Sequence, residues 1–153
     1  MWTDHEKTER KIWGILGLHR LSSLQTYGEN LNMEKLHDRD IREPLFEFLE
    51  ETYGRIRILE EKTMGKSRAD IVMVTPEYLY GIEIKSDADT YARLARQVKD
   101  YDSYYDYNIV VVGSSHALHI EEHVPDYWGI ITVEVTENCF DFYILRKAAA
   151  NPK

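Results

Sequence analysis

The sequence contains little cysteine and no long apolar run. Its one cysteine, Cys139, excludes an internal disulfide and any metal site built from several cysteines. No apolar run approaches the ~20 residues that span a bilayer, and the opening MWTDHEKTERK lacks the apolar core of a signal peptide. We therefore expect a cytoplasmic protein that makes no contact with a membrane.

An excess of positive charge is also missing. The formal net charge is −8 at pH 7, whereas nucleic-acid-binding proteins usually carry a basic surface. Basic residues are nevertheless grouped around the segment 68–85. Lys66 lies just before it, Arg68 lies at its start, and Arg93 and Arg96 follow it. A bound divalent cation would offset acidic residues at a site. The charge balance therefore weakens the case for a nucleic-acid partner without deciding it.

The order of predicted elements indicates one α/β domain behind a helical leader. Apolar spacing predicts an amphipathic helix over 4–21, which places an N-terminal helical extension at 1–36 and the main domain at 37–148. The main domain is predicted to contain a helix over 40–54, strands over 55–62, 69–75 and 78–85, a helix over 89–105, a strand over 108–113, a short helix over 114–123, and strands near 129–135 and 139–146. We expect a mixed central sheet flanked by helices.

Asp70, Glu83 and Lys85 interrupt the apolar residues of the segment 68–85, RADIVMVTPEYLYGIEIK. If residues 76–77 form the turn of a hairpin, Asp70 lies directly opposite Glu83. Period-two alternation places Glu83 and Lys85 on the same face of their strand. Two adjacent carboxylates repel each other unless a positive charge lies between them, and Mg²⁺ takes carboxylate and carbonyl oxygens. The segment therefore predicts a metal site suited to phosphodiester hydrolysis.

Asp70, a hairpin and then Glu83-Ile84-Lys85 resemble the motif of the PD-(D/E)XK nuclease superfamily. In that superfamily the motif lies on the second and third strands of an αβββαβ core, where the predicted element order also places it. The resemblance covers about residues 38–113 and departs from the pattern at Ala69, where the family name has proline. It implies a restriction-endonuclease-like fold, here with an extra N-terminal helix and added C-terminal strands.

The resemblance also implies roles for the residues of the motif. Asp70 and Glu83 would be metal ligands, the main-chain carbonyl of Ile84 would be a third ligand, and Lys85 would activate the attacking water. The expected activity is hydrolysis of DNA phosphodiester bonds with Mg²⁺, or with Mn²⁺ in its place. RNA stays open as a substrate, as does the choice between endonuclease and exonuclease activity.

Three more residues fit the resemblance, and each has an ordinary alternative. Glu43 matches a glutamate that members often add from the first core helix as a ligand, but a capping box with Asp40 and the helix dipole also explain it. Gln97 and Tyr101 match a catalytic glutamine followed four residues later by tyrosine on the next helix. Gln97 could instead be an exposed helix residue, and Tyr101 lies on the apolar stripe of its helix.

Other residues are candidates for binding a nucleic acid or a second metal. The candidate nucleic-acid contacts are Lys66, Arg68, Arg93, Arg96 and Tyr101. The two arginines of the helix could equally solvate its outer face. His116, His119 and His123 share a helix face at i, i+3, i+7 spacing, which would suit either a zinc ion or a solvated surface.

Two other classes of function stay open beside the nuclease. One is a catalytically inactive relative that keeps the fold as a nucleic-acid-binding or protein-interaction module. The other is an unrelated α/β domain in which Asp70, Glu83 and Lys85 form an ion pair with a spare carboxylate. The leader helix adds a homodimer as one option, because its apolar stripe could pair with a second copy.

Overall fold

A six-stranded mixed β-sheet forms the centre of the protein in the computed structural model, which describes residues 37–86, 89–137 and 139–152. The helices are α2 (Asp38–Tyr53), α3 (Leu94–Tyr104) and α4 (Ala117–Ile120), with 3-10 turns η1 (Tyr91–Arg93) and η2 (Ser114–His116). The strands are β1 (Arg57–Met64), β2 (Ser67–Val74), β3 (Leu79–Lys85), β4 (Tyr107–Gly113), β5 (Gly129–Thr136) and β6 (Cys139–Arg146). The expected helix over 4–21, and with it the extension 1–36 and a homodimer through it, lies outside the described residues.

The strands lie side by side in chain order, from β1 to β6. Strand β4 runs parallel to both of its neighbours, β3 and β5. The pairs β1–β2, β2–β3 and β5–β6 are antiparallel. The predicted order of helices and strands and the mixed sheet are therefore confirmed. Among the described residues, no helix combines the length and the hydropathy that crossing a bilayer requires.

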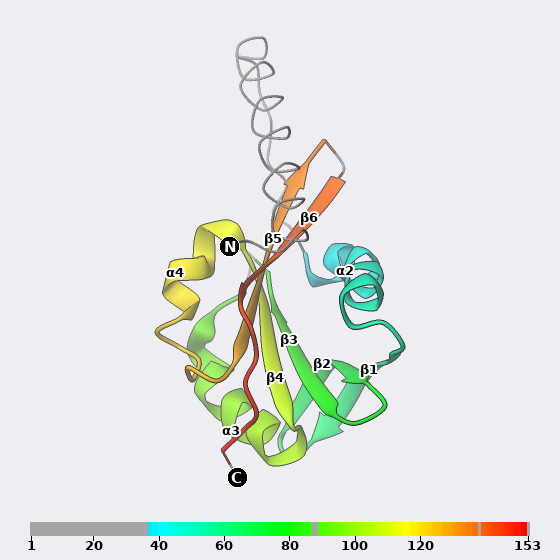
Figure 1. Ribbon diagram of the computed structural model, residues 1–153. Helices are drawn as coiled ribbons and strands as arrows, with labels where there is room; N and C mark the ends of the chain where they lie inside the picture. Colours follow the sequence, from blue (N-terminus) through cyan, green and yellow to red (C-terminus); the bar gives the residue numbers. More distant parts are fainter. Residues whose placement is uncertain (1–36, 87–88, 138, 153) are drawn as a thin grey trace, which may run out of the picture. The chain divides into compact units, whose positions relative to one another are not determined.

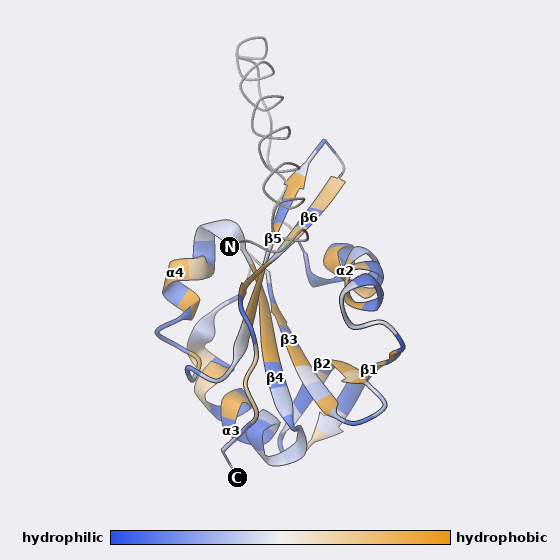
Figure 2. Cartoon of the chain, viewed as in Figure 1, coloured by the Kyte–Doolittle hydropathy of each residue, from blue (hydrophilic) through white to orange (hydrophobic). Residues whose placement is uncertain are grey.

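Helices cover both faces of the sheet, α2 on one and α3 with α4 on the other (Figure 1). On α2, Ile41, Leu45 and Leu49 follow the 3.6-residue period and are fully buried against the sheet. On the other face, Tyr101 of α3 packs against Trp128 in a second core cluster. The central strand β4 is apolar over residues 109–112 (Figure 2), which is typical of a strand buried on both faces, whereas β3 also carries the buried Glu83 and Lys85.

The β2–β3 hairpin has the register that a turn at residues 76–77 predicts. Val74 pairs with Leu79 and Ile71 pairs with Ile82, while the backbone N–H of Thr75 donates to the carbonyl of Tyr78 at 3.0 Å. One further step along this register sets Asp70 opposite Glu83, as expected. The hairpin therefore places both carboxylates at the same end of β2 and β3.

Helix α2 begins two residues earlier than the sequence pattern indicated. His37 is the N-cap, and Asp40 lies in the first turn, where its carboxylate accepts a hydrogen bond from the His37 backbone N–H at 3.3 Å. The expected capping box of Asp40 with Glu43 was therefore wrong. Pro44 lies inside the helix and lacks the N–H that would reach the Asp40 carbonyl, so packing on the sheet has to hold this turn.

Strand β1 is irregular at Glu61, which has a backbone φ of 54°. Glu60 pairs with Ile71 and Lys62 pairs with Ala69, but the ladder skips the position between them, where Glu61 faces Asp70. On either side of Asp70, Ala69 packs in the core cluster beneath α3 and Ile71 in the cluster beneath α2. Asp70 therefore lies where the strand changes the face to which its side chains point.

Candidate metal centre

Glu83 and Lys85 project from β3 toward α3, where both are buried, with exposed fractions of 2% and 8%. The Lys85 Nζ lies 2.7 Å from the Glu83 Oε1. Gln97 of α3 closes a triangle with them, since its Nε2 donates to Glu83 Oε1 at 2.6 Å and its Oε1 accepts from Lys85 Nζ at 3.1 Å. The structure thus brings together three residues from two elements, two from β3 and one from α3.

Tyr101, one helical turn after Gln97, contacts the other oxygen of Glu83. Its hydroxyl lies 2.7 Å from Glu83 Oε2 and accepts a hydrogen bond from the Asp70 backbone N–H at 3.3 Å. Burial, and then the negative charge of Glu83, raise the pKa of Tyr101 well above its usual value, so the phenol keeps its proton and donates it. We call Glu83, Lys85, Gln97 and Tyr101 the buried cluster.

Asp70 joins β2 to β3 through its side chain. Its Oδ2 accepts a hydrogen bond from the Ile84 backbone N–H at 2.8 Å, beyond the last ladder pair of the hairpin. Burial and the negative charge of Glu83 raise the pKa of Asp70 to about 8, although the Ile84 hydrogen bond and Arg42 act in the opposite direction. A carboxylate in such surroundings gains from a nearby cation, because the cation favours its charged form.

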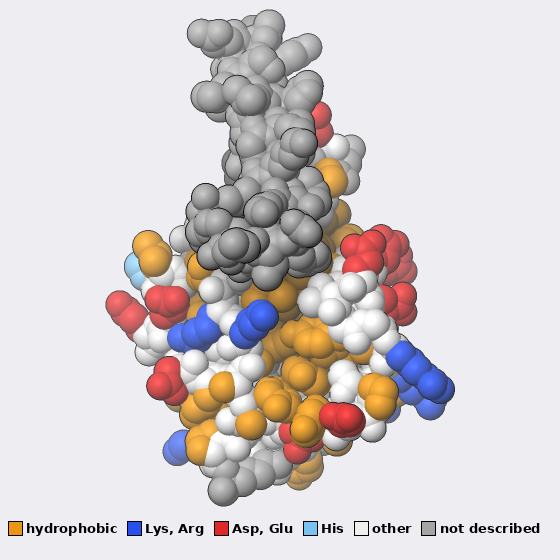
Figure 3. All heavy atoms as spheres, viewed as in Figure 1, with side chains coloured by type: hydrophobic (Ala, Val, Ile, Leu, Met, Phe, Trp, Pro, Cys, Tyr) orange, Lys and Arg blue, Asp and Glu red, His pale blue; other side chains and the backbone are white. Residues whose placement is uncertain are grey.

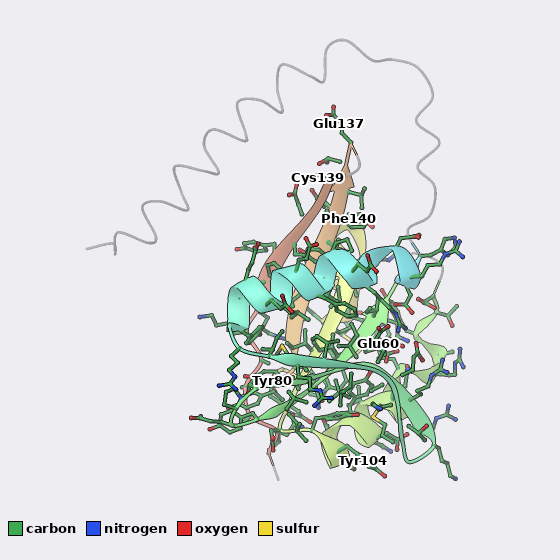
Figure 4. All side chains as sticks on the ribbon, turned by 90° about the vertical axis from the view of Figure 1, so that its right-hand side faces the viewer. Glu60, Tyr80, Tyr104, Glu137, Cys139 and Phe140 are labelled. Atoms are coloured by element: carbon green, nitrogen blue, oxygen red, sulfur yellow. The ribbon has the colours of Figure 1, made fainter. Side chains whose placement is uncertain are left out.

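A second set of charged residues lies on the other side of Asp70 and was missed by the sequence reasoning. The carboxylate oxygens of Asp38, Glu61 and Asp70 lie within 4.8 Å of one another. Figure 4 shows Glu60 below the N-terminal half of α2, on the strand that supplies Glu61. We call the residues that α2 and β1 contribute the outer cluster, namely Asp38, Arg42, Glu60 and Glu61.

Arg42 holds the outer cluster together. Its Nε and one terminal nitrogen donate to the two oxygens of Asp38 at 3.0 and 2.8 Å, and the other terminal nitrogen donates to Glu60 at 2.9 Å. It also donates to Glu61. The hydrogen bond to Asp38 is the largest of the influences that raise the pKa of Arg42 above its ordinary value. The sequence signal that could have revealed this cluster is the spacing of Asp38 and Arg42 by four residues, which is typical of an ion pair within a helix.

Glu43 and the predicted basic contact residues are all exposed, and Arg68 contacts the outer cluster. Glu43 is exposed on α2 and is not a member of the acidic group around Asp70. Arg68 is exposed and pairs with Glu61 at 2.6 Å. Lys66, Arg93 and Arg96 are exposed. Among the described residues, the three histidines 116, 119 and 123 do not form a group with metal-binding geometry.

The oxygen donors near Asp70 are of the type that a hard divalent cation prefers, since Asp70 and Glu83 carry carboxylates and Ile84 has a main-chain carbonyl. The carboxylates that lie within coordinating range of Asp70 are those of Asp38 and Glu61. Within the part of the chain that the structure describes, the acidic group at Asp70 contains no histidine or cysteine ligand, which zinc would favour. The pKa of Asp70 is raised first by burial and then by the negative charge of Glu83, and a cation bound beside Asp70 would oppose both effects.

The described residues define an α/β protein with helices on both faces of a six-stranded mixed sheet and a polar cluster at one end of β2 and β3. Residues 31–153 match the family described as Bacteriophage P4 protein cII, and the chain belongs to that family. Searches of curated proteins and of solved structures found no match to the chain.

Proposed function

We propose that the protein is a metal-dependent nuclease that hydrolyses DNA phosphodiester bonds. The observation that carries this proposal is the convergence of Asp70, Glu83 and Lys85 at one end of the β2–β3 hairpin, with Gln97 bridging two of them. The order of α2, β1, β2, β3, α3 and β4, with β3 parallel to β4, supports a restriction-endonuclease-like arrangement.

Three donors of this chain would hold the cation, for which Mg²⁺ is the first candidate and Mn²⁺ the second. They are the carboxylates of Asp70 and Glu83 and the main-chain carbonyl of Ile84. When bound, the cation supplies charge neutralisation at the phosphate and makes water more acidic. Asp70 Oδ2 accepts the Ile84 N–H, whereas Oδ1 accepts no hydrogen bond among the described contacts, so Oδ1 would have the greater capacity to bind the cation.

The protein's own side chains orient the reacting groups. Lys85 places an ammonium beside the carboxylates, where it can donate a hydrogen bond to the attacking water and so orient it, and where it can stabilise charge that develops on the phosphate. Gln97 fixes the direction of the Lys85 side chain through its Oε1. Tyr101 fixes Glu83 by donating to Oε2, which leaves little freedom for the carboxylate to turn.

The distribution of surface charge indicates the side from which DNA would approach. Figure 3 shows carboxylates gathered over α2, which would repel a phosphate backbone. The exposed face of η1 and α3 instead carries Arg93, Arg96 and Lys99 at i, i+3, i+6 spacing. This basic stripe would neutralise phosphates next to α3, the helix that supplies Gln97. Lys66, which directly precedes β2, adds a further positive charge.

A cleavage assay tests the proposal. Plasmid and single-stranded DNA are incubated with Mg²⁺ or Mn²⁺ and with the wild type, Lys85→Met or Asp70→Asn, and Glu47→Gln serves as a control on the exposed face of α2. We expect cleavage by the wild type and by the control, with a loss of roughly 10²-fold or more for Lys85→Met. Cleavage that persists unchanged in both site variants would contradict the proposal.

One observation favours a second candidate, a non-catalytic module for binding nucleic acid or protein. Both oxygens of Glu83 already have partners, and Arg42 already lies beside Asp70. Carboxylates whose charge is balanced by side chains of the same protein are as typical of an ion-pair network as of a metal site. A module of this class would bind its partner without cleaving it, and the binding would tolerate Asp70→Asn.

A further inference from the structure

Arg42 places a permanent positive charge beside a proposed metal ligand. Its nearest terminal nitrogen lies 3.8 Å from Asp70 Oδ1, and only 13% of the Arg42 side chain is exposed. The other oxygen of Asp70 accepts the hydrogen bond from Ile84. The oxygen of Asp70 with the greater capacity to bind a cation is therefore the one that faces the guanidinium.

The guanidinium is anchored in this place from two elements. Asp38, one turn earlier on α2, holds it with two hydrogen bonds, and Glu60 and Glu61 hold it from β1. Movement of Arg42 away from Asp70 requires several of these bonds to break together. The charge therefore persists beside Asp70 unless another cation takes its place.

We propose that Arg42 determines the affinity of the metal site by competing with the divalent cation for Asp70 Oδ1. This inference rests on the proposed metal-dependent function. A cation bound to that oxygen would lie within a few ångströms of the guanidinium, where two positive charges repel each other strongly in partly buried surroundings. Binding therefore requires either that this repulsion is overcome or that Arg42 withdraws toward Asp38 and Glu61.

Calorimetric titration of the full-length chain with Mn²⁺ tests this competition. The variant is Arg42→Gln, and the matched control is Arg39→Gln, which makes the same change of net charge on the same helix at a side chain that is 85% exposed. We expect Arg42→Gln to bind Mn²⁺ roughly tenfold more tightly than the wild type. The control should stay within about twofold, because solvent and salt screen its charge.

Two results would overturn the role of Arg42. Equal or weaker Mn²⁺ binding by folded Arg42→Gln, beside clear binding by the wild type, overturns this inference and leaves the metal site standing. Absence of binding to the wild type and to both variants overturns the metal site as well. The two failures are therefore distinguishable without any assay of cleavage.

A second measurement serves if Arg42→Gln does not fold, since that variant leaves Asp38, Glu60 and Glu61 without their shared cation. Mg²⁺ is titrated into the wild type while the NMR signal of the Arg42 Nε–H is followed, with Arg42→Lys used to assign that signal. The inference expects the signal to shift as the metal site fills. A signal that does not move at saturating Mg²⁺ overturns it.

Discussion

Asp70 lies between two clusters that are stabilised in different ways. The buried cluster lies under α3 and pairs a carboxylate with a lysine, an amide and a phenol, so that both Glu83 oxygens have partners. The outer cluster lies between α2 and β1, is partly exposed, and depends on one guanidinium to hold several carboxylates. Removing a member should therefore lower the free energy of unfolding more in the buried cluster. The polar groups left behind there are shielded from water and cannot replace the lost partner with a water molecule.

The largest effect is expected from Glu83→Ala. The substitution leaves the buried Lys85 ammonium with Gln97 as its remaining partner, and breaking a buried ion pair in this way costs about 3–5 kcal/mol of unfolding free energy. Urea denaturation followed by circular dichroism measures the loss. A loss below about 1 kcal/mol would show that the buried cluster is no more sensitive than a surface ion pair.

Tyr101→Phe should have the next largest effect. The phenyl ring keeps the packing against Trp128, but the variant loses the donor to Glu83 and the acceptor for the Asp70 N–H. We expect a loss of about 1–2 kcal/mol in the same denaturation experiment. Tyr105→Phe, which keeps a ring on the same face, is the control and should cost less, since Tyr105 makes no hydrogen bond to either carboxylate through its hydroxyl among the described contacts.

Asp70→Asn should stabilise the metal-free protein at neutral pH, by about 1 kcal/mol, because it removes a carboxyl group that ionises in the unfolded chain but that the folded state has to keep protonated. The pKa of Asp70 is raised to about 8 in the folded protein, above the ~3.9 of an unfolded chain. The folded state therefore holds this proton more tightly, and the contribution of Asp70 to stability falls as the pH rises between these two values.

Melting temperatures in EDTA at pH 5.5 and pH 8 check this dependence. The advantage of Asp70→Asn over the wild type should grow with pH, since the wild-type carboxylate becomes charged over this range. A difference that is the same at both pH values would show that Asp70 is already ionised in the folded protein at low pH.

The smallest effect is expected from Glu61→Gln in the outer cluster. Glu61 is partly exposed and shares Arg42 with Asp38 and Glu60, so the guanidinium keeps two partners. We expect a change within about 0.5 kcal/mol. A loss as large as that of Glu83→Ala would remove the contrast between the two clusters.

Much of the buried cluster could be predicted from the sequence because its contacts follow from local patterns. Alternation along one strand sets Glu83 beside Lys85, and a two-residue turn sets the register that brings Asp70 opposite Glu83. Spacing by four residues places Gln97 and Tyr101 on the same side of α3. The resemblance to a nuclease motif then marked Gln97 and Tyr101 as candidate site residues on the helix that follows the motif.

The outer cluster could not be predicted in the same way. Arg42 reaches Glu60 and Glu61 only because α2 crosses β1 in a particular position, which depends on the packing of the whole core. Glu61 also adopts a positive φ, for which a glutamate gives no warning in the sequence. For the same reason the sequence indicated Glu43 as a candidate on α2 but gave no sign that Asp38 lies close to Asp70.

Binding of Mn²⁺ to the wild type and to Asp70→Asn tests the central claim most directly. Asp70→Asn keeps the size of the side chain and an acceptor for the Ile84 N–H, so it changes the charge of the ligand and little else. The account predicts that the wild type binds Mn²⁺ and that Asp70→Asn binds it at least about tenfold more weakly. Equal affinity in the two proteins, or no binding to the wild type, would contradict a metal centre at Asp70 and Glu83.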